Sequence, residues 1–254
     1  MFRKESSRMP YTSAAALTQD LLFLFLLVVA PLWDYRDTKR LKSNASSVGK
    51  IRHYKTLCVW LWTAALAALL AVGFRPLFTI SPAPDEASWL FEHAWIRYLV
   101  GGVLVIYMAL ILLPVALAIW KNVTKRPRKY SSADAMKSLS YVLPATWTER
   151  RWYAFLCITA GICEEVLVRG FLQHYLHAFP FSLNLTLELL ISAVIFGLQH
   201  LYLGAGGAAS IAVSGLLFGL MFLLTGNLLL SVVFHSAMDL RMLLLLRPPV
   251  LQAT

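Results

Sequence analysis

Long apolar runs alternate with short polar segments along most of the 254 residues of this chain. A run of about 20 apolar residues is long enough to cross the hydrocarbon core of a bilayer as a helix. Seven runs approach or exceed that length, so the sequence predicts an all-α, polytopic membrane protein with about seven transmembrane helices. We expect them at residues 14–33, 56–74, 98–120, 152–176, 185–203, 208–225 and 228–246.

Composition supports the membrane interpretation. Hydrophobic residues make up 59% of the chain and charged residues only 14%. A soluble globular protein has about a quarter of its residues charged. The chain therefore has too few charges to cover the surface of a soluble protein of this length.

The net charge of +10 comes from basic residues that gather in two polar segments, 34–55 and 121–151. The polar segment between them, 75–97, has three acidic residues and only two arginines. Loops rich in Lys and Arg stay on the cytoplasmic side of a membrane. We therefore expect the N-terminus outside, the C-terminus in the cytoplasm, and a lipid bilayer rather than a nucleic acid as the partner of this charge. The expected location is a bacterial cytoplasmic (inner) membrane.

The ionisable residues divide the chain into three parts. Residues 1–120 hold about three spans without an ionisable cluster, and residues 121–150 form a basic cytoplasmic linker. Residues 151–247 contain nearly all the polar residues that lie inside apolar helices. Gly215 and Gly219, four residues apart, are spaced for close helix packing there.

The most unusual polar residues are the adjacent Glu164 and Glu165, followed by Arg169, inside the span 152–176. One charged side chain at the centre of a membrane helix costs about 2.5–3.5 kcal/mol. Glu165 and Arg169 are four residues apart, so they share a helix face and can form an ion pair. Glu164 lies about 100° around the helix and is free for another partner.

Two further apolar helices contribute His200, His235 and Asp239. His235 and Asp239 are also four residues apart and face one point. A lone histidine is more often a hydrogen-bonded core residue than a catalyst, and a buried Glu–Arg pair is usually structural. The combination over three apolar helices is far more specific and indicates a functional site.

In these residues the chain resembles the CAAX-protease and bacteriocin-processing family of intramembrane proteases, also called Abi or type II CAAX prenyl endopeptidases. The resemblance rests on three motifs in the family's order: Glu164-Glu165-x-x-x-Arg169, Phe196-x-x-x-His200 and His235-x-x-x-Asp239. It covers residues 151–246, and the first three spans have no part in it. It implies a catalytic helical core that cleaves a membrane-associated or lipidated peptide or protein.

Peptide hydrolysis needs an activated water and donors for the oxyanion. We expect Glu164 to be the general base, with His200 holding the same water. Glu165 and Arg169 would support and orient the site.

By resemblance, His235 and Asp239 would stabilise the oxyanion, although an ionised aspartate has no proton to donate. Asp239 would then be protonated, orient His235, or bind a metal. Glu164, His200 and His235 form a possible ligand set for zinc or another divalent metal. We favour the metal-independent alternative.

Two other classes of function stay open. Buried carboxylates and histidines also occur in proton-coupled transporters, but neither repeats nor paired broken helices are visible. A non-catalytic scaffold or bacteriocin-immunity protein would use the same fold to bind a peptide. One geometric expectation accompanies the protease hypothesis: residues 147–153 look interfacial, so the helix of Glu164 begins outside the hydrocarbon core.

Overall fold

The structure, a computed structural model, describes residues 13–78, 93–125, 139–178, 181 and 183–245, and these residues form helices and no strands. The all-α prediction is therefore confirmed for the described chain. The helical segments are α1 (Ser13–Leu24), η1 (Phe25–Val29), α2 (Ala30–Ser43), α3 (Ser47–Val72), α4 (Phe74–Phe78), α6 (Ala94–Val123), α8 (Trp147–Glu165), η2 (Val166–Leu172), α9 (Gln173–His177), α10 (Leu185–Leu198), η3 (Leu201–Leu203), α11 (Gly204–Thr225) and α12 (Leu229–Leu245).

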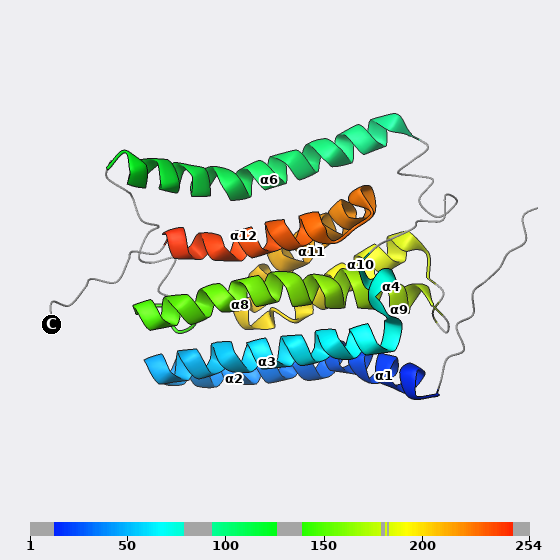
Figure 1. The fold of residues 1–254 in the computed structure, drawn as a ribbon, viewed down its shortest axis with the longest axis horizontal. Coiled ribbons are helices and arrows are strands. Elements are labelled where there is room, and N and C mark those ends of the chain that lie inside the picture. The colour runs from blue at the N-terminus through cyan, green and yellow to red at the C-terminus, as the bar shows by residue number, and fades with distance from the viewer. Residues whose placement is uncertain (1–12, 79–92, 126–138, 179–180, 182, 246–254) are drawn as a thin grey trace, which may run out of the picture.

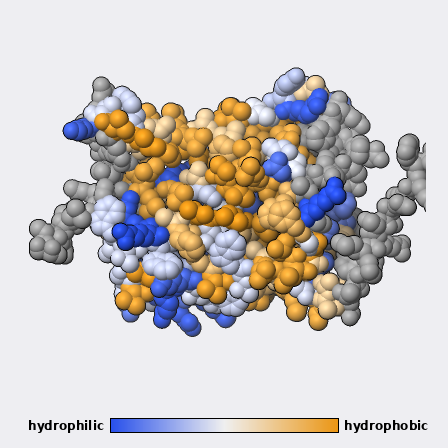
Figure 2. Space-filling model, viewed as in Figure 1, coloured by the Kyte–Doolittle hydropathy of each residue, from blue (hydrophilic) through white to orange (hydrophobic). Residues whose placement is uncertain are grey.

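The long helices lie roughly side by side (Figure 1), with α6 at one edge and α2 and α3 at the other. By length and composition, four described helical stretches could cross a membrane: Ala14–Ser43, Ser47–Val72, Ala94–Lys121 and Leu201–Thr225. Apolar residues dominate the middle of the face drawn in Figure 2, and hydrophilic residues gather toward its two ends. This distribution suits a polytopic membrane protein.

Helix α6 illustrates how such a surface arises. Its buried hydrophobic side chains are Leu104, Ile111 and Ala118, one every seventh residue, and they form a narrow stripe. Most other large apolar residues of α6, such as Leu110 at 67% exposure, face outward. A helix in water would not leave so many apolar side chains uncovered, whereas lipid covers them without cost.

The N-terminal helices share one core with the C-terminal helices. Leu22 of α1 and Ala68 of α3 belong to the same buried apolar cluster as Phe171 and Leu172 of η2. At Gly170 of η2 an added Cβ would lie 2.5 Å from a backbone oxygen of α4, so that glycine permits a close approach. The three-part division of the chain stays a prediction, but its first and third parts pack as one body.

The polar segment 34–55 is more helical than predicted. The stretch that begins at α1 continues through η1 and α2 to Ser43, and α3 begins at Ser47, nine residues before the predicted start. Only three residues separate the helices, and the Ser46 hydroxyl caps α3 by accepting a hydrogen bond from the Gly49 N–H at 3.1 Å. A helix with charged side chains can continue beyond the membrane into water. The charged residues of this segment therefore predicted where a membrane span ends and did not predict where the helix ends.

Helix α10 ends at Leu198, five residues before the predicted end of its span. A turn through His200 and the short η3 follows, and Gly204 adopts a φ of 80°, which lets the chain reverse into α11. With 14 residues, α10 rises only about 21 Å. The turn that bears His200 is therefore recessed toward the middle of the molecule.

Helix α8 begins at Trp147, as expected for a helix that starts before its membrane span. The Thr146 side chain accepts a hydrogen bond from the Glu149 N–H at 3.2 Å, and the Glu149 carboxylate accepts one from the Ala145 N–H at 2.7 Å. This pair resembles a capping box, with the N–H of Ala145, the residue before the N-cap Thr146, as the second donor, and it fixes the first turn of the helix. The position of this turn relative to a bilayer stays a prediction.

Glu149 also fastens α8 to α3. The Lys50 ammonium lies 3.7 Å from its carboxylate and donates to the backbone oxygens of Ser140 and Leu143 at 2.7 Å each. Burial alone would raise the pKa of Glu149, but the Ala145 N–H, hydroxyl donors and the Lys50 charge together hold that pKa below its ordinary value. The ionised form is therefore the stabilising one.

We predict that Glu149→Gln lowers the free energy of unfolding by about 1–3 kcal/mol at pH 7, because it removes a charged partner from a buried network. A depressed pKa stabilises the fold above the pKa of the unfolded state, and this stability is lost as the pH falls. The difference between wild type and variant should therefore shrink toward about pH 3, below the ordinary Glu pKa of about 4.3. Thermal unfolding in lipid nanodiscs at both pH values measures it, and a difference that grows in acid would contradict this role.

Candidate active site

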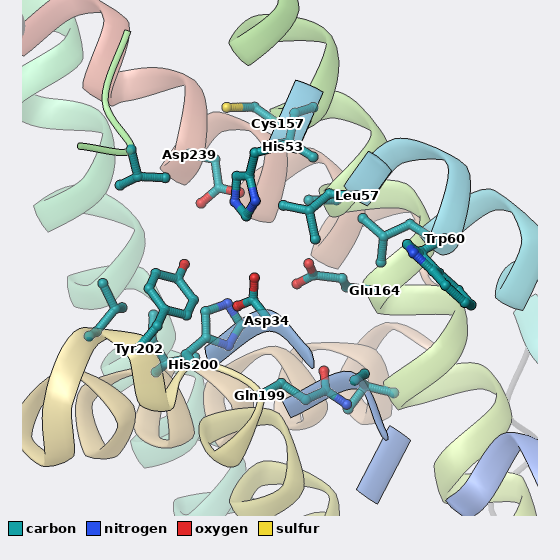
Figure 3. A pocket seen from close by; sticks show the side chains of 18 of the residues that line it. Asp34, His53, Leu57, Trp60, Cys157, Glu164, Gln199, His200, Tyr202 and Asp239 are labelled. Atoms are coloured by element: carbon teal, nitrogen blue, oxygen red, sulfur yellow. The ribbon is translucent and has the colours of Figure 1, made fainter. Parts of the chain in front are cut away.

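A cavity of about 410 Å³ lies between the N-terminal helices and the C-terminal core. Glu164, His200 and Asp239 are among the residues that line it. Figure 3 shows their side chains converging on the cavity from different elements. The structure thus places three of the four predicted catalytic residues on the wall of one cavity. The fourth, His235, does not line the cavity but lies next to Glu164 and Asp239.

Glu165 is fully buried and joins two helices behind the cavity. Its Oε1 accepts a hydrogen bond from Arg169 Nη1 at 2.9 Å and one from His235 Nδ1 at 2.8 Å. Arg169 Nη2 donates to the Gly215 carbonyl at 2.6 Å. The predicted Glu165–Arg169 ion pair is therefore present. The hydrogen bond from His235 was not predicted. It places the proton of that ring on Nδ1 and orients Nδ1 toward Glu165.

Aromatic rings pack against the side chains of Arg169 and His235. The Arg169 guanidinium lies 4.7 Å from the Phe196 ring centroid and 5.6 Å from that of Phe218. The His235 ring stacks on Phe218 at 5.3 Å. A Cβ on Gly215 would lie 3.0 Å from Phe196 and 3.3 Å from Arg169, so only glycine leaves this space free. Packing was predicted for Gly215, and the structure confirms it.

Glu164 and Asp239 meet at the other nitrogen of His235. Glu164 Oε2 and Asp239 Oδ2 each lie 3.7 Å from His235 Nε2. Glu164 Oε2 is buried and has no hydrogen-bond partner in the described structure. Glu164 is thus free of the Glu165–Arg169 pair, as its place on the helix predicted, and it faces the cavity.

His200 reaches the cavity from the recessed turn after α10. Its Nδ1 lies 3.0 Å from the Phe196 carbonyl. A carbonyl only accepts, so Nδ1 carries the proton and Nε2 of the neutral ring is a free acceptor. The neighbouring Gln199 donates to the Leu26 carbonyl of η1 at 3.2 Å, so the first helix of the chain holds this turn. π-helical segments such as η1 often occur at functional sites.

The proposed metal-ligand set does not assemble. Within the described ranges, no group of three His, Cys, Asp or Glu side chains is arranged to hold a metal ion. His200 makes its hydrogen bond to the Phe196 carbonyl, and in the described part of the chain no hydrogen bond or ion pair joins it to Glu164 or His235. The residues present thus do not fit the zinc site considered from the sequence, and we derive no step through a metal.

Three cavity residues were missed by sequence reasoning. Asp34 of α2 and His53 of α3 were counted only as charges of a cytoplasmic loop, and Tyr202 of η3 was treated as part of an apolar span. All three point into the cavity in Figure 3. The early end of α10 places Tyr202 there, and no periodicity in the sequence marks that end.

Comparison with protein families gives one match. Residues 146–241 match the model of the family described as type II CAAX prenyl endopeptidase Rce1-like. The match covers α8 to α12 and includes the three motifs, but not α1 to α6. No curated protein and no solved structure matches the chain. Residues 146–241 therefore resemble a family of intramembrane CAAX proteases.

Gly161 controls the distance between α8 and α12 next to the site. A Cβ there would lie 2.8 Å from the backbone nitrogen of Ser236 and 3.0 Å from its Cα, which cannot move without His235. We predict that Gly161→Val lowers the free energy of unfolding by about 1–3 kcal/mol through overpacking. Thermal unfolding in nanodiscs measures it, with Gly102→Val as control, since nothing lies within 4 Å of a Cβ on Gly102. Equal unfolding temperatures for the two variants would refute the close contact.

Proposed function

We propose that the chain is an intramembrane endopeptidase that hydrolyses a peptide bond of a membrane-associated or lipidated peptide with a water activated by Glu164. The family match of residues 146–241 supports the class of protease. The observation that favours this mechanism is the Glu164 side chain on the cavity wall, with its Oε2 3.7 Å from a His235 ring that the Glu165–Arg169 pair holds in one orientation.

Glu164 is the general base of the proposed reaction. Its carboxylate takes a proton from a water in the cavity, and the resulting hydroxide attacks the scissile carbonyl carbon. His200 Nε2, which has a free lone pair because Nδ1–H donates to Phe196, accepts the second O–H of that water and orients it. Glu164 then returns its proton to the leaving amine, so no proton is gained or lost over the cycle.

His235 stabilises the oxyanion of the tetrahedral intermediate. Its Nδ1–H is committed to Glu165, so Nε2 is the nitrogen that faces Glu164 and Asp239. When Nε2 also carries a proton, the ring is an imidazolium and donates to the oxyanion. The carboxylate of Asp239 does not donate; its negative charge at 3.7 Å favours that protonated ring. The Tyr202 hydroxyl, which points into the cavity, is a second donor (Figure 3).

We propose that the cavity opens toward the cytoplasmic side of a bacterial inner membrane. The support is the positive-inside distribution of Lys and Arg, which lie in the segments 34–55 and 121–151. In this orientation the start of α8 lies at the cytoplasmic interface. A lipidated peptide would then reach the cavity from the bilayer with its anchor still in lipid.

The test uses full-length protein in proteoliposomes and S-farnesylated peptides in which the modified cysteine is followed by three residues, the CAAX arrangement. Wild-type protein should release a tripeptide, identified by mass spectrometry. Glu164→Gln should lower kcat by about 10²–10⁴-fold, the usual contribution of a general base. Activity should persist with a chelator, because the mechanism uses no metal.

Glu188→Gln is the matched control. Glu188 is a buried glutamate paired with His177 at 2.9 Å, and neither residue lines the cavity. This variant should keep its kcat. Normal turnover by Glu164→Gln would refute the proposed base. A cellular phenotype that survives loss of both Glu164 and His200 would favour a peptide-binding scaffold, and substrate-dependent proton flux a transporter.

A further inference from the structure

Two helices outside the family match add ionisable side chains to the cavity. Asp34 of α2 and His53 of α3 line it together with Glu164. In Figure 3 the carboxylates of Asp34 and Glu164 both point into the cavity. The N-terminal helices therefore supply part of the proposed substrate chamber.

Asp34 has no cationic partner in the described structure. It accepts one long hydrogen bond, from the Thr38 hydroxyl at 3.5 Å, and takes part in no ion pair. Its neighbour Asp37, one turn along the same helix, is instead paired with His53 Nδ1 at 2.7 Å. Of these two carboxylates, Asp37 is satisfied within the protein and Asp34 is directed at the cavity.

The ionisable groups around the cavity are mainly acidic. Among the described residues, Asp34, Glu164 and Asp239 line it, against one lysine or arginine, Arg241. The other nearby arginine, Arg169, donates hydrogen bonds to Glu165 and to the Gly215 carbonyl and does not line the cavity. The chain as a whole has a net charge of +10, so this acidity is local. A partly buried carboxylate without a partner is costly, and a cation from a ligand would offset that cost.

Aromatic side chains form another wall of the same cavity. Trp33, Trp60 and Phe25 line the same cavity. Trp60 lies 6.2 Å from Trp33 and is stacked on Phe25 at 5.6 Å, measured between ring centroids. Aromatic faces attract ammonium and guanidinium groups and cover their aliphatic stems. A cavity that offers both a carboxylate and a group of aromatic rings is suited to a long cationic side chain.

We propose that Asp34 determines substrate specificity by binding a positively charged side chain, lysine or arginine, close to the scissile bond. This inference rests on the proposed protease function, which it deepens by naming the substrate class. The cation lies against the aromatic wall and donates to the Asp34 carboxylate while the scissile carbonyl faces Glu164. α2 thus selects the substrate, and the C-terminal helices hydrolyse it.

The experiment compares pairs of farnesylated CAAX-type peptides in which one position holds either lysine or glutamine. Three positions are tested in turn: the residue before the modified cysteine, and the first and the second residue after it. For one placement, wild-type protein in proteoliposomes should cleave the lysine peptide with about tenfold higher kcat/KM, the size expected of one charge-assisted hydrogen bond. Asp34→Asn should abolish this preference through KM, and Asp34→Glu should retain it. Glutamine peptides should be cleaved equally by all three proteins.

Asp37→Asn removes the same charge one turn away on the same helix and is the control for long-range electrostatics; it should keep the lysine preference. Cleavage without any preference, or an equal loss for both peptides in Asp34→Asn, would overturn the inference and leave the protease assignment standing. If wild type cleaves no peptide, the protease assignment fails. Binding of fluorescently labelled versions of the same peptides then decides the inference. Tighter binding of the lysine peptide that is lost in Asp34→Asn supports it, and equal binding of the lysine and glutamine peptides to wild type overturns it.

Discussion

The buried bond between Glu165 and Arg169 is the interaction on which the rest of the structure depends. Arg169 is 1% exposed and Glu165 is fully buried, so each would be very costly alone. Together they bind the Gly215 carbonyl of α11 and His235 of α12, and the ring of Phe196 from α10 covers the guanidinium. The continuous helix α8–η2 is thus joined to α10, α11 and α12 at one point, and the orientation of His235 follows from it.

This arrangement gives two adjacent glutamates different tasks. Glu165 is bound to Arg169 and His235, and its hydrogen bond to His235 Nδ1 fixes the tautomer of that ring. Glu164, about 100° around the helix, lines the cavity, and its Oε2 makes no hydrogen bond in the described structure. Its nearest charged neighbour is His235 Nε2 at 3.7 Å, on the ring that the Glu165–Arg169 pair holds in place.

Local spacing predicted the parts of the site that lie on one helix. The Glu165–Arg169 pair and the separate direction of Glu164 follow from 3.6 residues per turn, and apolar run lengths predicted the helices. Contacts between helices were not predictable in this way. The bond from His235 to Glu165 depends on how α12 crosses α8, and the turn at the end of α10 is held by the hydrogen bond from Gln199 to the Leu26 carbonyl of η1. Asp34 was masked by the basic residues around it.

The most direct test of the account is an experimental structure of the Glu164→Gln protein with an uncleaved farnesylated peptide. The account predicts that the scissile carbonyl carbon lies within about 3–3.5 Å of a water held between residue 164 and His200, the usual distance of reacting atoms in a near-attack geometry. The carbonyl oxygen should face His235 Nε2. A peptide bound in the cavity with its scissile bond away from these three side chains, or bound elsewhere, would contradict the account.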